Sequence, residues 1–214
     1  FSPDLPAVKA TMFKGSSVGS TLSVFNEGNG RDFSFSLEGP ASSLIEIESN
    51  SVYIPSGSFG QANFVIKGDF DPGVYPAYLT IYGEPDSLKV PFIVEIESPS
   101  PFFDVSADLP SVDIKAGDEV SIELTIYPLR VPGGEVSIKY YLSSFEGDLL
   151  YENKQTVYAG GQTQISSSFS VPSDALSGEY LLSVVVDYGS SIGVTSQIVQ
   201  TDISGSSKSP TFLF

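Results

Sequence analysis

The chain contains a long internal repeat that covers most of its 214 residues. A Gly-x-Tyr sequence followed by an alternating apolar run occurs twice, as Gly73-Val74-Tyr75 and as Gly178-Glu179-Tyr180, at an offset of 105 residues. The residues before them match at an offset of 102 residues: Gly15, Val18, Leu22 and Val24 match Gly117, Val120, Leu124 and Ile126. Because about 100 residues is a common domain size, the repeat predicts two domains of one kind.

Short runs in which apolar and polar residues alternate dominate both halves of the chain. A period of two residues is typical of strands with one buried face. In the first half we expect strands around residues 22–24, 33–37, 45–47, 52–54, 64–66, 79–81 and 90–96. Turn-forming Gly, Asn and Pro residues separate these runs, and no stretch shows a sustained helical period. Short strands at spacings of about 8 to 12 residues predict an all-β fold of two tandem immunoglobulin-like β-sandwich domains.

The domain boundaries follow from proline and glycine residues. Two prolines in Glu97-Ser98-Pro99-Ser100-Pro101 predict a stiff, extended spacer. We place the first domain at residues 1–98 and the second at 99–204. The second domain has an extra hairpin, with its tip at Glu146-Gly147-Asp148. Residues 205–214 are a polar spacer followed by an apolar C-terminal tail.

The two repeated tyrosines have a structural interpretation. In immunoglobulin-like sandwiches, a tyrosine near the start of the sixth strand commonly turns its hydroxyl back to the backbone at a corner. Tyr75 and Tyr180 each follow a glycine by two residues, Gly73 and Gly178 respectively. We therefore interpret these four residues as structural corners rather than as a ligand site.

With these features, both halves resemble the immunoglobulin-like or fibronectin-like modules, including the CARDB-like group, that occur in tandem in large archaeal and bacterial cell-surface proteins. The likeness rests on Leu22-Ser23-Val24-Phe25-Asn26-Glu27-Gly28, similar to the strand and Asn-x-Gly turn of those modules, and on the two Gly-x-Tyr corners. It covers about residues 5–203, and the second half departs from it where Tyr127-Pro128-Leu129-Arg130 replaces the Asn-x-Gly turn. The resemblance implies a cell-surface location and a spacer, filament, surface-layer or adhesion role.

The composition excludes several classes of function. Acidic residues outnumber basic ones by 26 to 10, and the net charge of −16 disfavours nucleic-acid and anionic membrane-surface binding. The chain has no Cys and no His, so it lacks disulfides, thiolate nucleophiles, the commonest general base and the usual zinc ligand. No run approaches the ~18 apolar residues of a membrane-spanning helix. Because the chain starts at Phe1 without Met or a signal core, we expect a processed or excised piece of a longer product.

We predict no catalytic residue. Acids do occur in pairs two residues apart, and on a strand this spacing puts both on one face, opposite apolar neighbours. We expect these pairs on solvated outer faces: Glu46 and Glu48, Asp69 and Asp71, and Glu95 and Glu97.

Calcium is the one metal that the composition permits, because hard cations accept oxygen ligands from carboxylates and carbonyls. The candidate ligands are Asp69 and Asp71, joined by Asp32 or Glu84. The equivalent loop of the second half keeps only Asp174, and the chain has no Asp-x-Asp-x-Asp-Gly loop. We expect no other cofactor.

The C-terminal tail ends in three apolar residues, Phe212, Leu213 and Phe214, which a monomer has little reason to expose. One interpretation is that the tail, alone or with Phe1, packs on a neighbouring subunit and adds a strand to its open sheet edge, which would build filaments or lattices. The other two are that the tail begins a membrane anchor or folds onto its own second domain.

We therefore expect a non-catalytic extracellular module, a spacer or an assembly subunit of a cell-surface protein, whose partners are proteins and include copies of itself. The alternative is a carbohydrate- or calcium-binding adhesion module. Because the chain has no Trp, sugar stacking would rest on tyrosines such as Tyr78 and Tyr141. The other interpretation of these two tyrosines, which we favour, is that they cover a sheet edge or form a contact between the domains.

Overall fold

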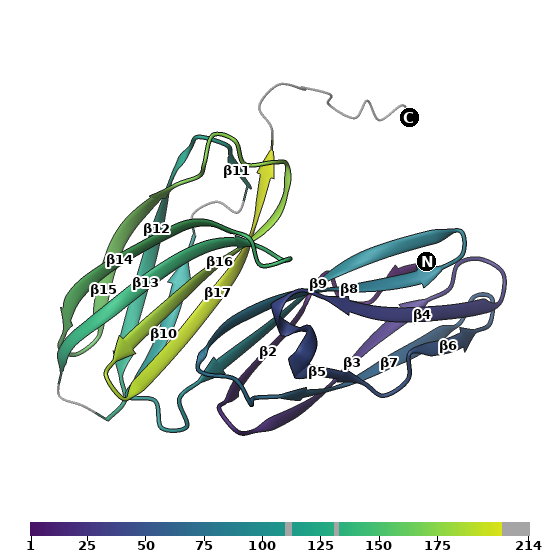
Figure 1. Ribbon diagram of the computed structural model, residues 1–214, viewed down its shortest axis with the longest axis horizontal. Coiled ribbons are helices and arrows are strands. Elements are labelled where there is room, and N and C mark those ends of the chain that lie inside the picture. The colour runs from purple at the N-terminus through teal and green to yellow at the C-terminus, as the bar shows by residue number, and fades with distance from the viewer. Residues whose placement is uncertain (110–112, 131–132, 203–214) are drawn as a thin grey trace.

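The computed structural model describes residues 1–109, 113–130 and 133–202 (Figure 1). These residues form two tandem immunoglobulin-like β-sandwiches, which confirms the predicted fold class. Their helical content is one short 3-10 helix, η1 (Pro40–Leu44). No helix in the described ranges is long and apolar enough to cross a membrane.

The first sandwich packs a four-stranded sheet, β1-β3-β7-β5, against a five-stranded sheet, β2-β9-β8-β4-β6. Inward-facing residues at alternate strand positions, such as Leu22, Phe33, Phe64 and Leu79, are fully buried between the sheets. The strands are β1 (Ser2–Pro3), β2 (Val8–Phe13), β3 (Ser17–Phe25), β4 (Arg31–Glu38), β5 (Ile45–Ile47), β6 (Ser51–Ile54), β7 (Phe59–Lys67), β8 (Gly73–Gly83) and β9 (Asp86–Glu97).

Strands β1 and β2 are not among the strands expected from the sequence. β2 buries Val8, Ala10 and Met12 and pairs in parallel with β9, so that Val8 lies opposite Phe92. Alanine is a weak strand former, and a partner strand at the other end of the domain leaves no local signal in the sequence. Tertiary pairing therefore decides the structure of this segment.

The second sandwich packs a three-stranded sheet, β10-β12-β15, against a five-stranded sheet, β11-β17-β16-β13-β14. Its core contains Leu124, Tyr140, Phe169 and Val184, all buried. The strands are β10 (Phe103–Asp108), β11 (Asp113–Lys115), β12 (Glu119–Pro128), β13 (Gly134–Ser144), β14 (Leu149–Ala159), β15 (Thr163–Ser170), β16 (Gly178–Tyr188) and β17 (Ser191–Asp202).

The internal repeat of the sequence is also a structural repeat. Strands β8 and β16 begin at Gly73 and Gly178, and β9 and β17 have equal lengths at the same offset. β2 pairs in parallel with β9, as β11 does with β17. The two sandwiches differ in one segment of the chain. Between β4 and β7 the first sandwich contains η1, β5 and β6, whereas between β13 and β15 the second contains the single long strand β14. As a result, β5 covers the edge of β7, but no described strand covers the edge of β15.

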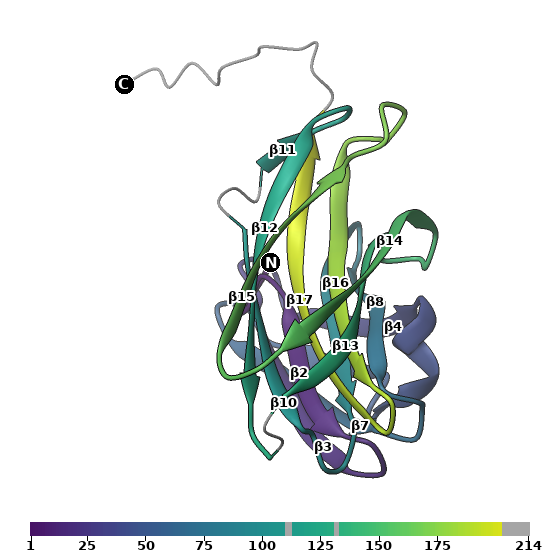
Figure 2. The ribbon, with the colours of Figure 1, turned by 90° about the vertical axis from the view of Figure 1, so that its left-hand side faces the viewer.

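The two sandwiches lie against each other at an angle rather than end to end, as Figures 1 and 2 show. β8 and β9 of the first sandwich contact β16 and β17 of the second. The proline-containing spacer is fixed at one end, because Ser98 N donates to Ile192 O at 3.0 Å and Ile192 N donates to Ser98 Oγ at 2.8 Å. The spacer therefore joins two sandwiches that are in direct contact and does not hold them apart.

Candidate functional site

The surface between the two sandwiches is the most elaborate site outside the two cores. Its centre is a small apolar cluster of Ile93 on β9, Phe145 at the tip of the β13–β14 hairpin and Leu181 on β16, which are 2%, 0% and 0% exposed. Val74, Tyr78 and Ile198 pack around them. Apart from Phe145, these residues occupy outward-facing strand positions, where an isolated sandwich would present polar residues. We call this cluster, together with Glu95 and its partners below, the joint.

Phe145 is the residue of the second sandwich that enters the joint from the hairpin tip. Its ring lies 4.9 Å from the ring of Tyr78, centroid to centroid, at an interplanar angle of 36°. Lys89 also contacts Tyr78, with its Nζ 5.0 Å from the centroid of the tyrosine ring. The same Nζ lies 3.8 Å from the carboxylate of Glu38 in the first sandwich and 3.7 Å from that of Glu146 in the second. The extra hairpin of the second half thus contacts the first sandwich.

Glu95 is the charged residue of the joint. Its side chain is 4% exposed, and its Oε1 is 2.7 Å from Lys9 Nζ on β2. Thr11 Oγ1 donates to Glu95 Oε2 at 2.7 Å, and Ser196 Oγ, from the second sandwich, donates to Oε1 at 2.7 Å. Lys9 Nζ also donates to Ser196 O at 2.9 Å. A buried carboxylate is stable only when it is paired and hydrogen-bonded, and both conditions hold here.

The prediction that Glu95 lies on a solvated outer face is therefore wrong. Alternation correctly places Glu95 on the outer face of β9, but the second sandwich covers that face. Glu97, two residues further along β9, is half-buried, and this burial raises the pKa of its carboxyl above the ordinary value. Glu46, by contrast, is exposed and forms an ion pair with Lys67 at 2.8 Å, which lowers the pKa of the Glu46 carboxyl.

Tyr78 illustrates the environment of the joint. Burial raises the pKa of its phenol to about 12. The carboxylates of Glu179 and Glu146 add to the shift because they repel the negative charge of a phenolate. Burial also raises the pKa of Glu179. A tyrosine with these neighbours is a contact residue between the sandwiches rather than an exposed platform for a sugar ring.

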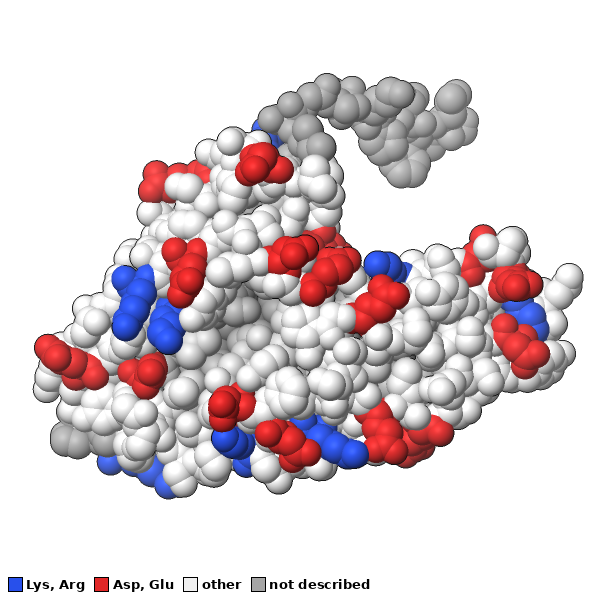
Figure 3. Space-filling view, viewed as in Figure 1, with Lys and Arg blue, Asp and Glu red and all other residues white. Residues whose placement is uncertain are grey.

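A groove of about 370 Å³ opens beside the joint. The first sandwich contributes Pro72 to Pro76 to its wall, and the second contributes Lys139, Tyr141, Asp187 and Ile192. In Figure 3 this region appears as the hollow between the two sandwiches. Tyr141 thus lines a concave surface between two domains, which is a common place for ligand sites.

The two corner tyrosines make equivalent hydrogen bonds. Tyr75 Oη donates to Asp71 O at 2.7 Å, and Tyr180 Oη donates to Leu176 O at 3.1 Å. Each bond returns the side chain to a backbone carbonyl four residues earlier in the chain. Gly73 and Gly178 are the first residues of the strands that carry these tyrosines.

The candidate calcium ligands do not converge. Asp69 and Asp71 are both exposed, and the carboxylate of Asp71 accepts a hydrogen bond from Lys14 Nζ at 2.6 Å. That lysine lowers the pKa of the Asp71 carboxyl and supplies the positive charge that a cation would otherwise provide. Within the described ranges no three acids gather closely enough to hold a metal ion.

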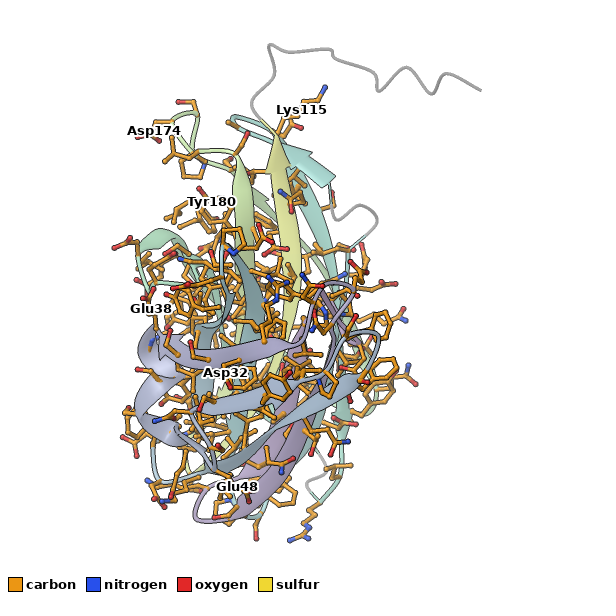
Figure 4. The ribbon with its side chains drawn as sticks, turned by 90° about the vertical axis from the view of Figure 1, so that its right-hand side faces the viewer. Asp32, Glu38, Glu48, Lys115, Asp174 and Tyr180 are labelled. Carbon is orange, nitrogen blue, oxygen red and sulfur yellow. The ribbon has the colours of Figure 1, made fainter. Side chains whose placement is uncertain are left out.

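The remaining acids lie over both sandwiches, and some of them line two common pockets: Glu146, Asp148, Asp174 and Glu179 line one, and Asp32, Glu84 and Asp86 line the other. Figure 3 shows red side chains scattered over both sandwiches, and in Figure 4 the labelled Asp32, Glu38, Glu48 and Asp174 lie well apart.

The tail residues Phe212, Leu213 and Phe214 lie outside the described residues. Phe1 packs on its own sandwich: its ring lies 5.1 Å from that of Phe33 in an edge-to-face arrangement, with the Arg31 guanidinium over it at 5.6 Å. Phe1 is therefore covered by its own sandwich, and the assembly interpretation depends on the tail alone.

Known proteins that are similar to this chain share its fold. No family model matches the chain, and no curated protein matches it. Among solved structures, the chain is similar to a PapD-like domain of human CEP192, with 9% identity and a TM-score of 0.39, covering 46% of this chain and 86% of that one. The CupB2 chaperone of Pseudomonas aeruginosa matches with 9% identity and a TM-score of 0.36 over 92% of this chain and 98% of the chaperone.

A CARDB domain from Pyrococcus furiosus is also similar, with 18% identity and a TM-score of 0.34 over 47% of this chain and 94% of that domain. The CARDB-like group that the sequence resembles is thus among the similar solved structures.

Proposed function

We propose that this chain is a non-catalytic structural and interaction element of an extracellular or cell-surface protein, in which two immunoglobulin-like sandwiches act as one rigid unit. Its role is that of a spacer or of an assembly subunit in a filament or surface layer. The observation that carries this proposal is the joint, which buries Phe145 and Glu95 between the sandwiches.

The joint supports rigidity because it combines two kinds of contact. Tandem domains generally move relative to each other unless the interface between them is substantial and apolar. Here Ile93, Phe145 and Leu181 are removed from water, and the cost of exposing them opposes separation of the sandwiches. Separation would also break the Ser196 hydrogen bond to Glu95, whose donor and acceptor lie on different sandwiches.

Rigidity can be measured as a distance distribution between two spin labels. The chain has no native Cys, so Tyr53→Cys and Tyr158→Cys provide two unique and exposed labelling sites, 61% and 68% exposed, one on each sandwich. Double electron–electron resonance should give one narrow distance distribution. The further substitution Phe145→Ala removes the central side chain of the joint and should broaden it.

A matched control separates loosening of the joint from general destabilisation. Phe169→Ala removes a phenylalanine of similar burial from the core of the second sandwich, away from the joint. Under conditions in which this variant stays folded, its distance distribution should stay narrow. A broad distribution in the unsubstituted labelled chain would refute the proposal of a rigid unit.

The alternative function is a carbohydrate- or calcium-binding adhesion module. The groove beside the joint favours its carbohydrate form, because Tyr75 and Tyr141 line it together with the charged residues Lys139 and Asp187. A glycan-array signal that Tyr141→Ala abolishes would support this alternative over a purely structural role.

A further inference from the structure

Strand β15 ends its sheet without a covering strand, although its counterpart in the first sandwich is covered. In the first sandwich β5 pairs with β7, and Ile47 lies opposite Phe64. The sequence repeat aligns Phe64 with Phe169 of β15, but β15 pairs with β12 alone among the described strands. Figure 2 faces the side of the second sandwich where β14 and β15 end the two sheets. One domain therefore lacks a strand that its twin has.

The register identifies which backbone groups are unpaired. Val171 N donates to Asp118 O at 2.9 Å, and residues of an antiparallel pair face their partner strand at every second position. Counting back along β15, Phe169, Ser167 and Ile165 point their N–H and C=O groups at β12. The backbone groups of Gln164, Ser166 and Ser168 point the other way, and we call them the open edge of β15.

The open edge of β15 lacks the features that usually block strand addition. Natural proteins protect terminal strands with charged residues, prolines or shortness. Among the described strands that end a sheet and exceed four residues, β2 contains Lys9, β10 contains Asp104 and Asp108, and β14 contains Glu152 and Lys154. β15 has eight residues and contains neither a charge nor a proline. It is therefore the described terminal strand best suited to accept another strand.

Side chains beside the open edge define what an added strand would contact on its inner face. Tyr151 of β14 and Phe169 of β15 pack together at one end, with ring centroids 5.8 Å apart. Val157 and Ile165 are half-buried at the other end, so both ends are apolar. Between them the site is polar, because Gln155 Nε2 donates to the hydroxyl of Tyr140 at 2.6 Å.

The outer face beside the open edge is negatively charged. Ser166 Oγ donates to Glu123 at 2.9 Å, and Ser168 Oγ donates to Glu119 at 2.7 Å. Both glutamates are exposed, and no Lys or Arg of the described ranges forms an ion pair with either. They lie one strand inward from β15, about 10 Å from the position of an added strand, because adjacent strands are roughly 4.8 Å apart. Long basic side chains can reach this far across the short serines.

We propose that the open edge of β15 binds an extended, basic segment of a partner protein as an added strand. The five central residues of this segment read apolar, basic, polar, basic, apolar: the apolar residues cover the Tyr151–Phe169 and Val157–Ile165 ends, and the basic residues face Glu119 and Glu123. This pattern reads the same in both directions, so it serves a parallel or an antiparallel segment. The proposal rests on the proposed function, since it names the partner of an interaction element.

The test is a peptide titration followed by NMR on the whole chain. The probe is acetyl-Lys-Val-Lys-Thr-Lys-Val-Lys-amide, and the control peptide has Glu in place of every Lys. The basic probe should shift the amide signals of Gln164, Ser166 and Ser168 in a saturable way, whereas the acidic peptide should shift them at least tenfold more weakly. Spin-label distances from the rigidity experiment are recorded independently. A failure of the strand-addition proposal therefore leaves the rigid-unit proposal intact, and a failure of the rigid-unit proposal leaves the strand-addition proposal intact.

Two sets of variants test the two halves of the argument. Ser168→Pro removes one backbone donor from the open edge and no backbone hydrogen bond to β12, and it also removes the hydroxyl that donates to Glu119. The variant should therefore fold and bind the basic probe about tenfold or more weakly. Ser168→Ala is the matched control for loss of the hydroxyl alone, and it should weaken binding less. The pair Glu119→Gln with Glu123→Gln should weaken binding roughly 3- to 30-fold, as expected for two exposed charge contacts. Glu48→Gln with Glu135→Gln removes the same charge elsewhere and should leave binding unchanged.

Several results would overturn the proposal. One is the absence of saturable shifts at millimolar probe; another is equal binding of the acidic peptide. β1 pairs only with Val24 and Phe25 of β3. Shifts centred on residues 17–22 of β3 or on β14 would therefore place strand addition elsewhere. Self-association that Ser168→Pro abolishes would assign the open edge of β15 to a second copy of this chain instead. If Ser168→Pro does not fold, unchanged binding by the glutamine variants still refutes the charge argument.

Discussion

Replacing Glu95 by alanine should be one of the most destabilising single changes on the outer surface of either sandwich. The substitution leaves Lys9 without its counter-ion and Thr11 and Ser196 without their acceptor. Removing one partner of a buried ion pair costs about 3 to 5 kcal/mol. The lower end applies here, because the Lys9 side chain is 41% exposed and water can reach its ammonium group. We therefore expect a loss of about 3 kcal/mol.

Urea unfolding measures this loss. With a slope on the order of 2 kcal/mol per molar urea, the midpoint should fall by about 1.5 M. Glu46→Ala is the matched control, because the Glu46–Lys67 pair has nearly the same nitrogen-to-oxygen distance, 2.8 Å against 2.7 Å, but lies in solvent. Exposed pairs contribute little, so this variant should keep its midpoint within error. Equal midpoints for the two variants would refute the reasoning, because they would mean that burial of Glu95 adds nothing.

Two further predictions concern tyrosines. Tyr75→Phe deletes the hydroxyl bond to Asp71 O and should lower stability by about 0.5 to 1.5 kcal/mol, seen in calorimetry as a fall of a few degrees in Tm; an unchanged Tm would mean that the bond contributes nothing. The pKa of Tyr78 is raised to about 12, above the value of about 10 in an unfolded chain, so the stability contributed by its neutral phenol is present below pH 10 and is lost as the pH rises through 12. Burial also raises the pKa of Tyr75 and of Tyr140, so absorbance titration near 295 nm should show a late step that Tyr78→Phe reduces by one phenol, and a late step of unchanged size in that variant would contradict the assignment.

The fold class follows from the sequence because alternation and turn residues are local signals. Val120, Ile122, Leu124 and Ile126 alternate with polar residues, and in the structure all four are buried in the second core. The repeated Gly-x-Tyr sequence marks Gly73 and Gly178, which are the first residues of β8 and β16, although the strand expected around residues 79–81 begins six residues earlier, at Gly73. Alternation needs only the residues of one strand, and the repeat needs only a comparison of the two halves of the sequence.

The joint does not follow from the sequence, because alternation shows which residues share a face but not what covers that face. Glu95 alternates with buried residues, as a solvated glutamate would, but one of its hydrogen-bond partners, Ser196, lies about a hundred residues later in the chain. A signal was nevertheless present. Ile93 and Leu181 are large apolar residues at outward-facing positions, and such residues on neighbouring strands predict a covered face.

The joint has a consequence for how longer arrays of such modules would be built. Strands β8 and β9 meet β16 and β17, their own counterparts in the repeat, and Ile93 and its counterpart Ile198 belong to the same cluster. Like surfaces therefore face each other, as in the self-complementary contact of a twofold dimer. Such a contact is saturated by two members, so a third module would have to attach through a different surface, and an extended array would grow in units of two.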